Sequence, residues 1–359
     1  MDSQEPSLAQ ARKDDHVKHA LDQHSKFMKS PFDQIRFVHH SLNQVDFKSL
    51  DLSTQWAGHQ HPLPFYINGM TGGSDFTKKY NRQLAQVAAE TGLAMASGSV
   101  SAALKDPSVS DSFTVIRQMN PKGFVLANIG AHHHVDNAKK AVDLLQANAL
   151  QIHLNIPQEV VMPEGDRDFS TWLRNIEDIV AEVGVPVIVK EVGFGMSKQT
   201  IKNLIQVGVR TIDISGRGGT NFINIENARR DQLDFSALGD WGQTTPESLL
   251  EAQAYLSNVE ILASGGIRHF VDIVKALSLG ARASGISGHF LKSVHDKGVD
   301  ETIKMVDQWQ ESLRHMMLLL GCQTIQDIQS QEIVLGQELT HWAHSRGIDL
   351  SPILKDRQQ

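Results

Sequence analysis

The feature that most constrains the fold of this chain is the alternation of short apolar segments with stretches of helical periodicity. Eight segments have the length and composition of buried β-strands, at 64–69, 94–98, 124–130, 149–155, 185–192, 211–215, 259–266 and 281–287. Amphipathic patterns separate most of them, at 81–90, 136–147, 198–207, 248–257 and 268–279. Strands that alternate with helices form parallel sheets. Eight such units in about 225 residues predict a (β/α)8 barrel, the TIM barrel, whose usual length is about 250 residues.

An open, doubly wound sheet is the alternative α/β fold. It typically has fewer strands, and for dinucleotides it carries a Gly-x-Gly-x-x-Gly turn after its first strand. Here the first predicted strand is followed by Met70-Thr71-Gly72-Gly73. This turn of small residues lets backbone approach a ligand without matching that fingerprint. The barrel is therefore the favoured fold.

The barrel is expected to occupy 63–290, between an N-terminal arm at 1–62 and a C-terminal region at 291–359. Helical patterns in the arm cover 16–23 and 32–42, and those in the C-terminal region cover 303–320 and 332–344. Gly321 follows the first of the two C-terminal patterns and is a plausible helix C-cap. We expect these last helices to pack on the barrel or at a subunit interface.

Composition excludes several classes of protein. With 34 Lys and Arg against 41 Asp and Glu, the net charge is −7, which does not suit a nucleic-acid backbone. The single Cys322 excludes an intrachain disulfide and any two-cysteine metal or redox site. The first twenty residues lack the apolar core of a signal peptide, and no segment approaches the roughly 18 apolar residues of a membrane span. We expect a soluble cytoplasmic protein without nucleic-acid or membrane partners.

The fourth predicted strand has an unusual polar face. Gln151, His153 and Asn155 alternate with apolar residues and so share one side of the strand, whereas barrel interiors are normally filled by Val, Ile and Leu. The row continues into Gln158 and Glu159 at the expected mouth of the barrel. Any one of these residues could belong to an internal hydrogen-bond network. Five of them leading to the mouth indicate a ligand site.

The fifth predicted strand ends in Lys190-Glu191 after five apolar residues. A buried lysine loses its charge unless an anion or a cofactor compensates it. An ion pair, either between these two residues or across strands, is as consistent with the sequence as a ligand contact. Both interpretations stay open at this point.

The last third of the barrel carries a specific phosphate signal. The motif from Ser264 to Arg268 reads Ser-Gly-Gly-Ile-Arg after the seventh strand, and Gly285-Ile286-Ser287-Gly288 ends the eighth. Loops at these two positions of a TIM barrel commonly bind phosphate through backbone N–H groups and a helix N-terminus. Arg268 can add a bidentate contact. We therefore expect a phosphorylated ligand or cofactor here, rather than glycines that only form tight turns.

Three further features carry less weight. Three consecutive histidines at 132–134 cannot all face one metal from a regular element, and no His-Glu-x-x-His spacing occurs, so we expect no zinc site. Arg12 and Lys13, judged alone, indicate a solvated basic pair. Cys322 lies beyond the barrel and is not expected to act as a nucleophile.

Taken together, these motifs resemble those of the type 2 isopentenyl-diphosphate delta-isomerases. These are FMN-dependent (β/α)8 enzymes that interconvert isopentenyl diphosphate and dimethylallyl diphosphate in isoprenoid biosynthesis. The resemblance covers nearly the whole chain, and its most specific part is Arg12-Lys13 together with Gln-x-His-x-Asn-x-x-Gln-Glu at 151–159. The Gly-Gly-Ile-Arg end is weaker because several FMN barrels carry it. The other matching motifs are Met70-Thr71-Gly72-Gly73, Ala127-Asn128-Ile129-Gly130, Met162-Pro163-Glu164-Gly165-Asp166 and Ser215-Gly216-Arg217-Gly218-Gly219-Thr220.

The resemblance implies roles for individual residues. The substrate would be bound by Arg12 and Lys13 of the arm and by His153, Asn155 and Gln158. Of these, Gln158 would face the alkene as the catalytic residue. Glu159 would hold a Mg2+ that bridges to the diphosphate, in keeping with the ligands that Mg2+ prefers. FMN would contact Gly69, Met70, Thr71, Ser99, Asn128, Lys190, Ser215, Thr220, Ser264, Gly265, Gly266, Arg268, Ile286 and Ser287.

The resemblance also implies a mechanism without net redox change. FMN reduced by NADPH is expected to mediate proton addition and elimination, because Gln158 does not titrate and no ordinary base is placed for both steps. The family forms tetramers or octamers, so a homo-oligomer is expected.

One motif departs from the family pattern. The family often has Gly-Ser-Gln-Arg after the second strand, whereas this chain has Gly98-Ser99-Val100-Ser101. The arginine that would add to the anion site is therefore replaced by Ser101. Arg217 or another cation is a candidate to compensate for it.

Two rival functions share parts of this pattern. An FMN-dependent 2-hydroxy-acid oxidase has the barrel and the phosphate end, but it needs a histidine base, and His269 follows the phosphate loop in a poor position for that role. A nucleotide dehydrogenase barrel would need a loop cysteine. A non-catalytic flavin-binding scaffold predicts loss of Gln158, Glu159 or the Arg12-Lys13 pair, and all are present.

Overall fold

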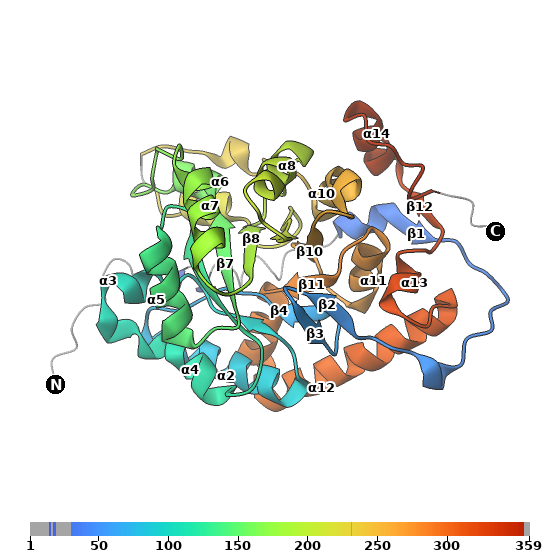
Figure 1. Cartoon of the computed structure of the whole chain (residues 1–359), viewed down its shortest axis with the longest axis horizontal. Coiled ribbons are helices and arrows are strands. Elements are labelled where there is room, and N and C mark those ends of the chain that lie inside the picture. Colours follow the sequence, from blue (N-terminus) through green and yellow to red (C-terminus); the bar gives the residue numbers. More distant parts are fainter. Residues whose placement is uncertain (1–13, 16, 19–29, 231, 355–359) are drawn as a thin grey trace.

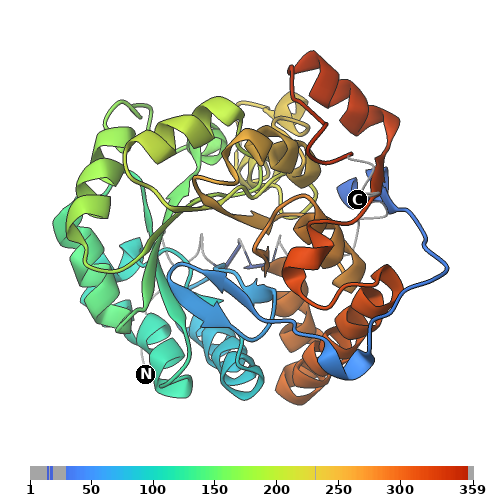
Figure 2. The same ribbon diagram turned by 45° about the vertical axis from the view of Figure 1, so that its right-hand side comes forward.

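The computed structural model describes residues 14–15, 17–18, 30–230 and 232–354, and its centre is a closed barrel of parallel strands (Figures 1 and 2). Around the barrel these are β4 (Phe65–Ile67), β5 (Met95–Ala96), β6 (Val125–Gly130), β7 (Ala149–Leu154), β8 (Val187–Glu191), β9 (Thr211–Asp213), β10 (Glu260–Ser264) and β11 (Ala283–Ile286). Pairing of β11 with β4 closes the barrel. Each of the eight predicted segments contains one strand, so the TIM-barrel prediction is confirmed.

Helices cover the outside of the barrel (Figure 2). The longer ones are α2 (Asp75–Thr91), α4 (Asp111–Met119), α5 (Val135–Leu145), α7 (Trp172–Glu182), α8 (Lys198–Gln206), α10 (Thr245–Ala252), α11 (Phe270–Ser278) and α12 (Gly288–Leu320). Three short helices lie in the connections that leave the carboxyl ends of strands, namely α3 (Ser101–Lys105), α6 (Ile156–Val161) and α9 (Phe222–Asn227). In α2, for example, Leu84 and Val87 are buried, as the amphipathic pattern predicts. None of the described helices is both long and apolar enough to cross a membrane.

A hairpin that the sequence did not predict lies beside the amino-terminal ends of the barrel strands. Strands β2 (Thr54–Trp56) and β3 (His59–His61) pair through a turn in which Ala57 and Gly58 have positive φ, as two-residue hairpin turns require. Trp56 is 1% exposed, stacks on His61 and packs against Tyr66 on β4. Together with Ala94, Ala96, Leu126 and Ala149, it forms a small apolar cluster. This packing fills the barrel interior with side chains at the amino-terminal ends of the strands.

The structure corrects two predicted helices. Segment 32–42 begins with the 3-10 turn η1 (Pro31–Gln34) and strand β1 (Ile35–Phe37), not an α-helix. Segment 332–344 begins with strand β12 (Ile333–Leu335), and only its remainder forms helix α14 (Gln337–Ser345). The two strands pair antiparallel. Each is too short to show an alternating pattern, and their pairing across some 300 residues outweighs the local preference.

Two smaller predictions about the ends of the chain have different outcomes. Helix α12 ends at Leu320, and the following Gly321, with a φ of 69°, is the predicted C-cap. The helical pattern at 16–23 falls mostly outside the described residues. The segment 31–34 lies against the barrel, where the Phe32 carbonyl accepts a hydrogen bond from Lys275 Nζ at 2.9 Å.

Candidate active site

A cavity of about 510 Å3 lies at the carboxyl ends of the barrel strands, a volume typical of sites for small molecules and cofactors. Seventeen of the residues predicted to form the site line it: Gly69, Met70, Ser99, Asn128, His153, Asn155, Gln158, Glu159, Lys190, Ser215, Thr220, Ser264, Gly265, Gly266, Arg268, Ile286 and Ser287. Thr71 is buried and does not line the cavity, although its carbonyl accepts the Gly98 amide at 3.1 Å. Arg12 and Lys13 lie outside the described residues.

The polar face of β7 forms a hydrogen-bonded floor. Gln151 is fully buried, and its amide donates to Asn68 Oδ1 and accepts from Asn128 Nδ2, both at 3.1 Å. Asn128 Oδ1 lies 2.8 Å from His153 Nδ1. Because a carbonyl oxygen only accepts, this contact places a proton on Nδ1 of the His153 ring. Gln151 thus belongs to an internal network, while Asn128 and His153 connect that network to the cavity.

Asp213, which the sequence did not single out, anchors the floor beside Lys190. Its fully buried carboxylate accepts hydrogen bonds from Tyr66 Oη at 2.9 Å, Asn68 Nδ2 at 2.8 Å and Ser264 Oγ at 2.6 Å. Lys190 is its neighbour in the β8–β9 register. Burial lowers the pKa of Lys190, and the charge of Asp213 opposes that shift.

The Glu191 carboxylate accepts hydrogen bonds from backbone amides instead of lining the cavity. One carboxylate oxygen accepts the amides of Val192, Gly193 and Phe194 at 2.6 to 2.8 Å. Burial raises the pKa of Glu191 to about 7, against the effect of these amides and of Lys190. Lys190 therefore does not share its partner with Glu191; it lines the cavity beside Asp213, a position that is compatible with both a ligand contact and a charge interaction across strands.

The loop after β10 forms a glycine cradle. Gly265 and Gly266 have φ values of +90° and +76°, which favour glycine. A Cβ at Gly265 would overlap the Gly216 carbonyl oxygen, and one at Gly266 would press against Pro31 of the arm. The cradle therefore exists only because these side chains are absent. Such close-approach loops fit a phosphate group, with Arg268 beside them at the cavity.

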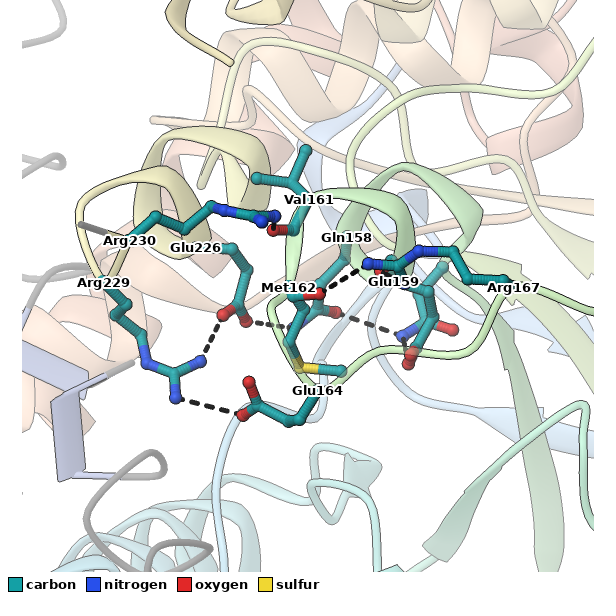
Figure 3. Close-up of polar contacts among 10 residues, drawn as sticks. Gln158, Glu159, Val161, Met162, Glu164, Arg167, Glu226, Arg229 and Arg230 are labelled. Carbon is teal, nitrogen blue, oxygen red and sulfur yellow. Dashed lines mark hydrogen bonds and ion pairs between the residues drawn. The ribbon is translucent and has the colours of Figure 1, made fainter. Parts of the chain in front are cut away.

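Glu159 is held from two sides at the cavity wall. Its Oε1 accepts from Asn155 Nδ2 at 2.8 Å, and its Oε2 accepts the Asp166 amide at 2.9 Å. Arg167 fixes the following loop by donating to the carbonyls of Glu159, at 2.6 Å, and Met162, at 3.0 Å (Figure 3). These donors orient the Glu159 carboxylate toward the ligand space.

The oxygen donors at this wall fit a magnesium ion. Glu159, Glu164 and Asp166 all line the cavity, and Mg2+ is usually bound by one or two carboxylates together with phosphate oxygens and waters. Within the described ranges, no cluster of three or more His, Cys, Asp or Glu side chains could hold a metal alone. A metal here would need a ligand such as a diphosphate to complete its coordination.

Gln158 belongs to a charged network that the sequence did not reveal (Figure 3). Its Nε2 donates to Glu226 Oε1 at 2.8 Å, and its Oε1 accepts from Asn155 Nδ2 at 3.2 Å. Glu226, on α9, is fully buried and forms an ion pair with Arg229. Arg229 also pairs with Glu164 at 3.0 Å. Burial alone would lower the pKa of Arg229, but the two carboxylates hold it above its ordinary value.

Two residues weighed from the sequence do not join the cavity lining. His269 directly precedes α11, and its half-exposed side chain lies 3.9 Å from Asp272, so His269 itself is not placed as the base that an oxidase needs. Arg217 pairs with Asp240 at 3.4 Å. It therefore does not supply the cation that Ser101 lacks.

Comparison with known proteins decides the family. Residues 136–335 match the FMN-dependent dehydrogenase family. An isopentenyl-diphosphate delta-isomerase from Latilactobacillus sakei is 52% identical over 96% of this chain and 98% of its own, and one from Staphylococcus saprophyticus is 50% identical over 94% and 97%. The chain belongs to the isopentenyl-diphosphate delta-isomerase family.

More distant structures share only the fold of this isomerase family member. A solved mandelate oxidase variant superposes with a TM-score of 0.63 at 17% identity, covering 91% of this chain and 94% of its own. Another covers 92% and 100%, with a TM-score of 0.62 at 18% identity. Identity this low supports the barrel architecture and carries no inference about activity.

Proposed function

We propose that this chain interconverts isopentenyl diphosphate and dimethylallyl diphosphate by adding a proton to one end of the double bond and removing one at the other. The observation that carries the proposal is the joint presence of the glycine cradle, Glu159 and the Gln158 amide in one cavity. Relatives about 50% identical over almost the whole chain bear the corresponding name.

FMN is the cofactor that the family match supports. Its phosphate fits the Gly265–Gly266 cradle and Arg268, and Lys190 would face the ring system from β8. When bound and reduced, here by NADPH, FMN supplies an electron-rich ring that can exchange a proton and stabilise developing positive charge. Asp213 accepts a hydrogen bond from Ser264 and lies opposite Lys190 in the strand register, so it would help to position both residues.

Glu159 and His153 would bind the polar end of the substrate. The carboxylate of Glu159, already held by Asn155 and the Asp166 amide, would take a Mg2+ that bridges to the diphosphate. The His153 ring is fixed by its hydrogen bond with Asn128. These contacts would fix the alkene relative to the rest of the cavity, which lowers the entropic part of the barrier.

Gln158 would position the reacting end of the substrate. Its amide does not titrate, but Glu226 accepts its N–H and so fixes which end of the amide faces the ligand. The buried Glu226 carboxylate also places negative charge one hydrogen bond away from Gln158, where it would stabilise a carbocation-like state. We therefore assign orientation and electrostatic support to this pair.

The N-terminal arm would complete the substrate site. Asp14 Oδ1 accepts a hydrogen bond from Ser74 Oγ at 2.5 Å, and Ser74 is the N-cap of α2, directly after the Met70–Gly73 turn. This contact brings the arm to the carboxyl end of β4, next to the cavity. It supports the expectation that Arg12 and Lys13, which directly precede Asp14 in sequence, contact the diphosphate.

The proposal also includes a cytoplasmic homo-oligomer, a tetramer or octamer, with residues 291–359 at the barrel surface or a subunit contact. These points rest on the family resemblance and the sequence pattern.

Product formation from isopentenyl diphosphate tests the proposal. The complete anaerobic mixture contains FMN, NADPH and Mg2+, and each is omitted in turn. Dimethylallyl diphosphate is expected only when the flavin is reduced and Mg2+ is present. A purified protein that binds flavin but leaves this substrate unchanged would refute the isomerase assignment and favour an oxidase or a flavin-binding scaffold.

A further inference from the structure

The first turn of α10 lies beside the glycine cradle without lining the cavity. Its first residue, Thr245, is fully buried. Thr245 Oγ1 donates to the Ser264 carbonyl at 2.7 Å and to the Gly265 carbonyl at 2.6 Å. A Cβ on Gly216 would overlap the Thr245 backbone nitrogen, so this turn also packs directly against the loop after β9. The site as described so far gives Thr245 no role.

The two carbonyl contacts fix the direction of the cradle amides. A trans peptide group is planar, so its N–H lies opposite its C=O. The carbonyls of Ser264 and Gly265 are both directed at Thr245, and the amides of Gly265 and Gly266 therefore point to the opposite side. Within the part of the chain that the structure describes, neither amide donates a hydrogen bond. Because both glycines line the cavity, these two N–H groups can bind an anion there.

The peptide between Gly265 and Gly266 depends on Thr245 more than its neighbour does. Among the described residues, the Gly265 carbonyl accepts a hydrogen bond only from Thr245, whereas the Ser264 carbonyl also accepts the Gly216 amide at 3.1 Å. A peptide between two glycines can rotate at low steric cost because neither residue has a Cβ. Without the Thr245 hydroxyl, rotation would turn the Gly265 carbonyl oxygen toward the cavity and the Gly266 amide away from it, which would repel an anion.

We propose that Thr245 is a positioning residue for the FMN phosphate, because its hydroxyl holds the Gly265–Gly266 peptide with the amide toward the anion. Thr245 itself contacts neither the phosphate nor the substrate, and it acts through the peptide groups of the cradle. The inference rests on the proposed function in one respect, which is the placement of the FMN phosphate at this loop. It extends the cofactor site to α10, a helix whose residues do not line the cavity.

A comparison of FMN with riboflavin tests this role, because riboflavin has the same ring system and no phosphate. Wild type should bind FMN at least about a hundredfold more tightly than riboflavin in fluorescence titrations. Thr245→Val removes the hydroxyl and should weaken FMN binding about tenfold, the effect of losing one charge-assisted amide contact, while riboflavin binding stays within about twofold. Thr245→Ala should show the same selective loss. Thr245→Ser keeps the hydroxyl and should stay within about threefold of wild type for FMN.

Thr54→Val is the matched control. Thr54 is also buried, and its Oγ1 donates to the Arg282 carbonyl at 2.8 Å, at the amino-terminal end of β11. Thr245→Val and Thr54→Val each remove a buried hydroxyl that donates to backbone, so both should lower Tm by a similar amount. Only the Thr245 variants should change the ratio of FMN affinity to riboflavin affinity.

The outcomes separate this inference from the proposals on which it rests. Selective loss of FMN affinity in Thr245→Val and Thr245→Ala, restored in Thr245→Ser, would support the positioning role. Equal losses for both flavins, or an unchanged ratio of the two affinities, would overturn it. If wild type itself shows no preference for FMN, the phosphate is not bound at the cradle and both assignments fail. If the preference depends on Thr245 but no dimethylallyl diphosphate forms, the isomerase proposal fails and the positioning role stands.

Discussion

Removing the guanidinium of Arg229 should reveal how strongly the Gln158–Glu226 pair depends on its support. Glu226 is fully buried and contacts both Gln158 Nε2 and Arg229. In Arg229→Met, the Glu226 carboxylate loses its ion pair with the guanidinium and keeps the hydrogen bond from the neutral Gln158 amide. Breaking a buried ion pair costs about 3–5 kcal/mol. Because the Arg229 side chain is 20% exposed, solvent screening reduces our expectation to about 2 kcal/mol.

The assay combines thermal unfolding with steady-state kinetics. For 359 residues at about 2.1 cal/mol/K each, the unfolding entropy is about 0.75 kcal/mol/K, so a loss of 2 kcal/mol lowers Tm by about 3 °C. A misplaced Gln158 amide should also lower kcat about tenfold or more, equal to about 1.4 kcal/mol of lost transition-state stabilisation.

Arg174→Met is the control for this experiment. Arg174 forms an exposed ion pair with Asp178 at 3.4 Å, and such pairs contribute little. The control should leave Tm and kcat unchanged. If Arg229→Met behaved like this control, the argument that Arg229 supports Glu226 and Gln158 would be wrong.

Three other substitutions test separate parts of the site. Glu159→Gln should raise the Mg2+ concentration needed for half-maximal activity about tenfold or more while FMN absorbance of the protein is kept; full activity at low Mg2+ would rule out the metal role. Gly265→Ala should weaken FMN binding about tenfold in a fluorescence titration because it strains a positive-φ position, whereas Gly347→Ala, at an open positive-φ position, should not. Burial lowers the pKa of His133 to about 4, so the unfolded chain takes up the proton first as pH falls from about 6.5. Wild type should therefore lose up to about 3 kcal/mol of stability relative to His133→Asn between pH 6.5 and 4, and parallel pH profiles of Tm would contradict this.

The barrel could be predicted from the sequence because its signals are local. Each buried strand is a short apolar run, and each covering helix has its own amphipathic period. The β1–β12 pair and the β2–β3 hairpin escaped prediction for the opposite reason. Their strands are three residues long, and β1 finds its partner near the other end of the chain.

The site was predictable where a motif has fixed spacing and not where side chains meet across loops. His153 and Asn155 share one face of the same predicted strand, as period two predicts, and Gln158 and Glu159 follow on the next helix, so all four could be expected to reach the cavity that they line.

Glu226 gave no such signal, because it lies on α9, far from Gln158 in sequence. The two side chains form their hydrogen bond only once the barrel has folded. Asp213 lies inside the predicted strand 211–215, and no motif singles it out. Its hydrogen bonds with Tyr66 and Ser264 form only when the closed barrel brings side chains of β4, β9 and β10 together.

The most direct test of the central claim is anaerobic turnover of isopentenyl diphosphate in D2O, with NADPH oxidation followed in the same vessel. Proton addition and elimination without net redox change predicts deuterium in the dimethylallyl diphosphate and many product molecules for each NADPH oxidised. Product that forms only in step with NADPH oxidation, or an enzyme that oxidises a 2-hydroxy acid and leaves the diphosphate unchanged, would contradict it.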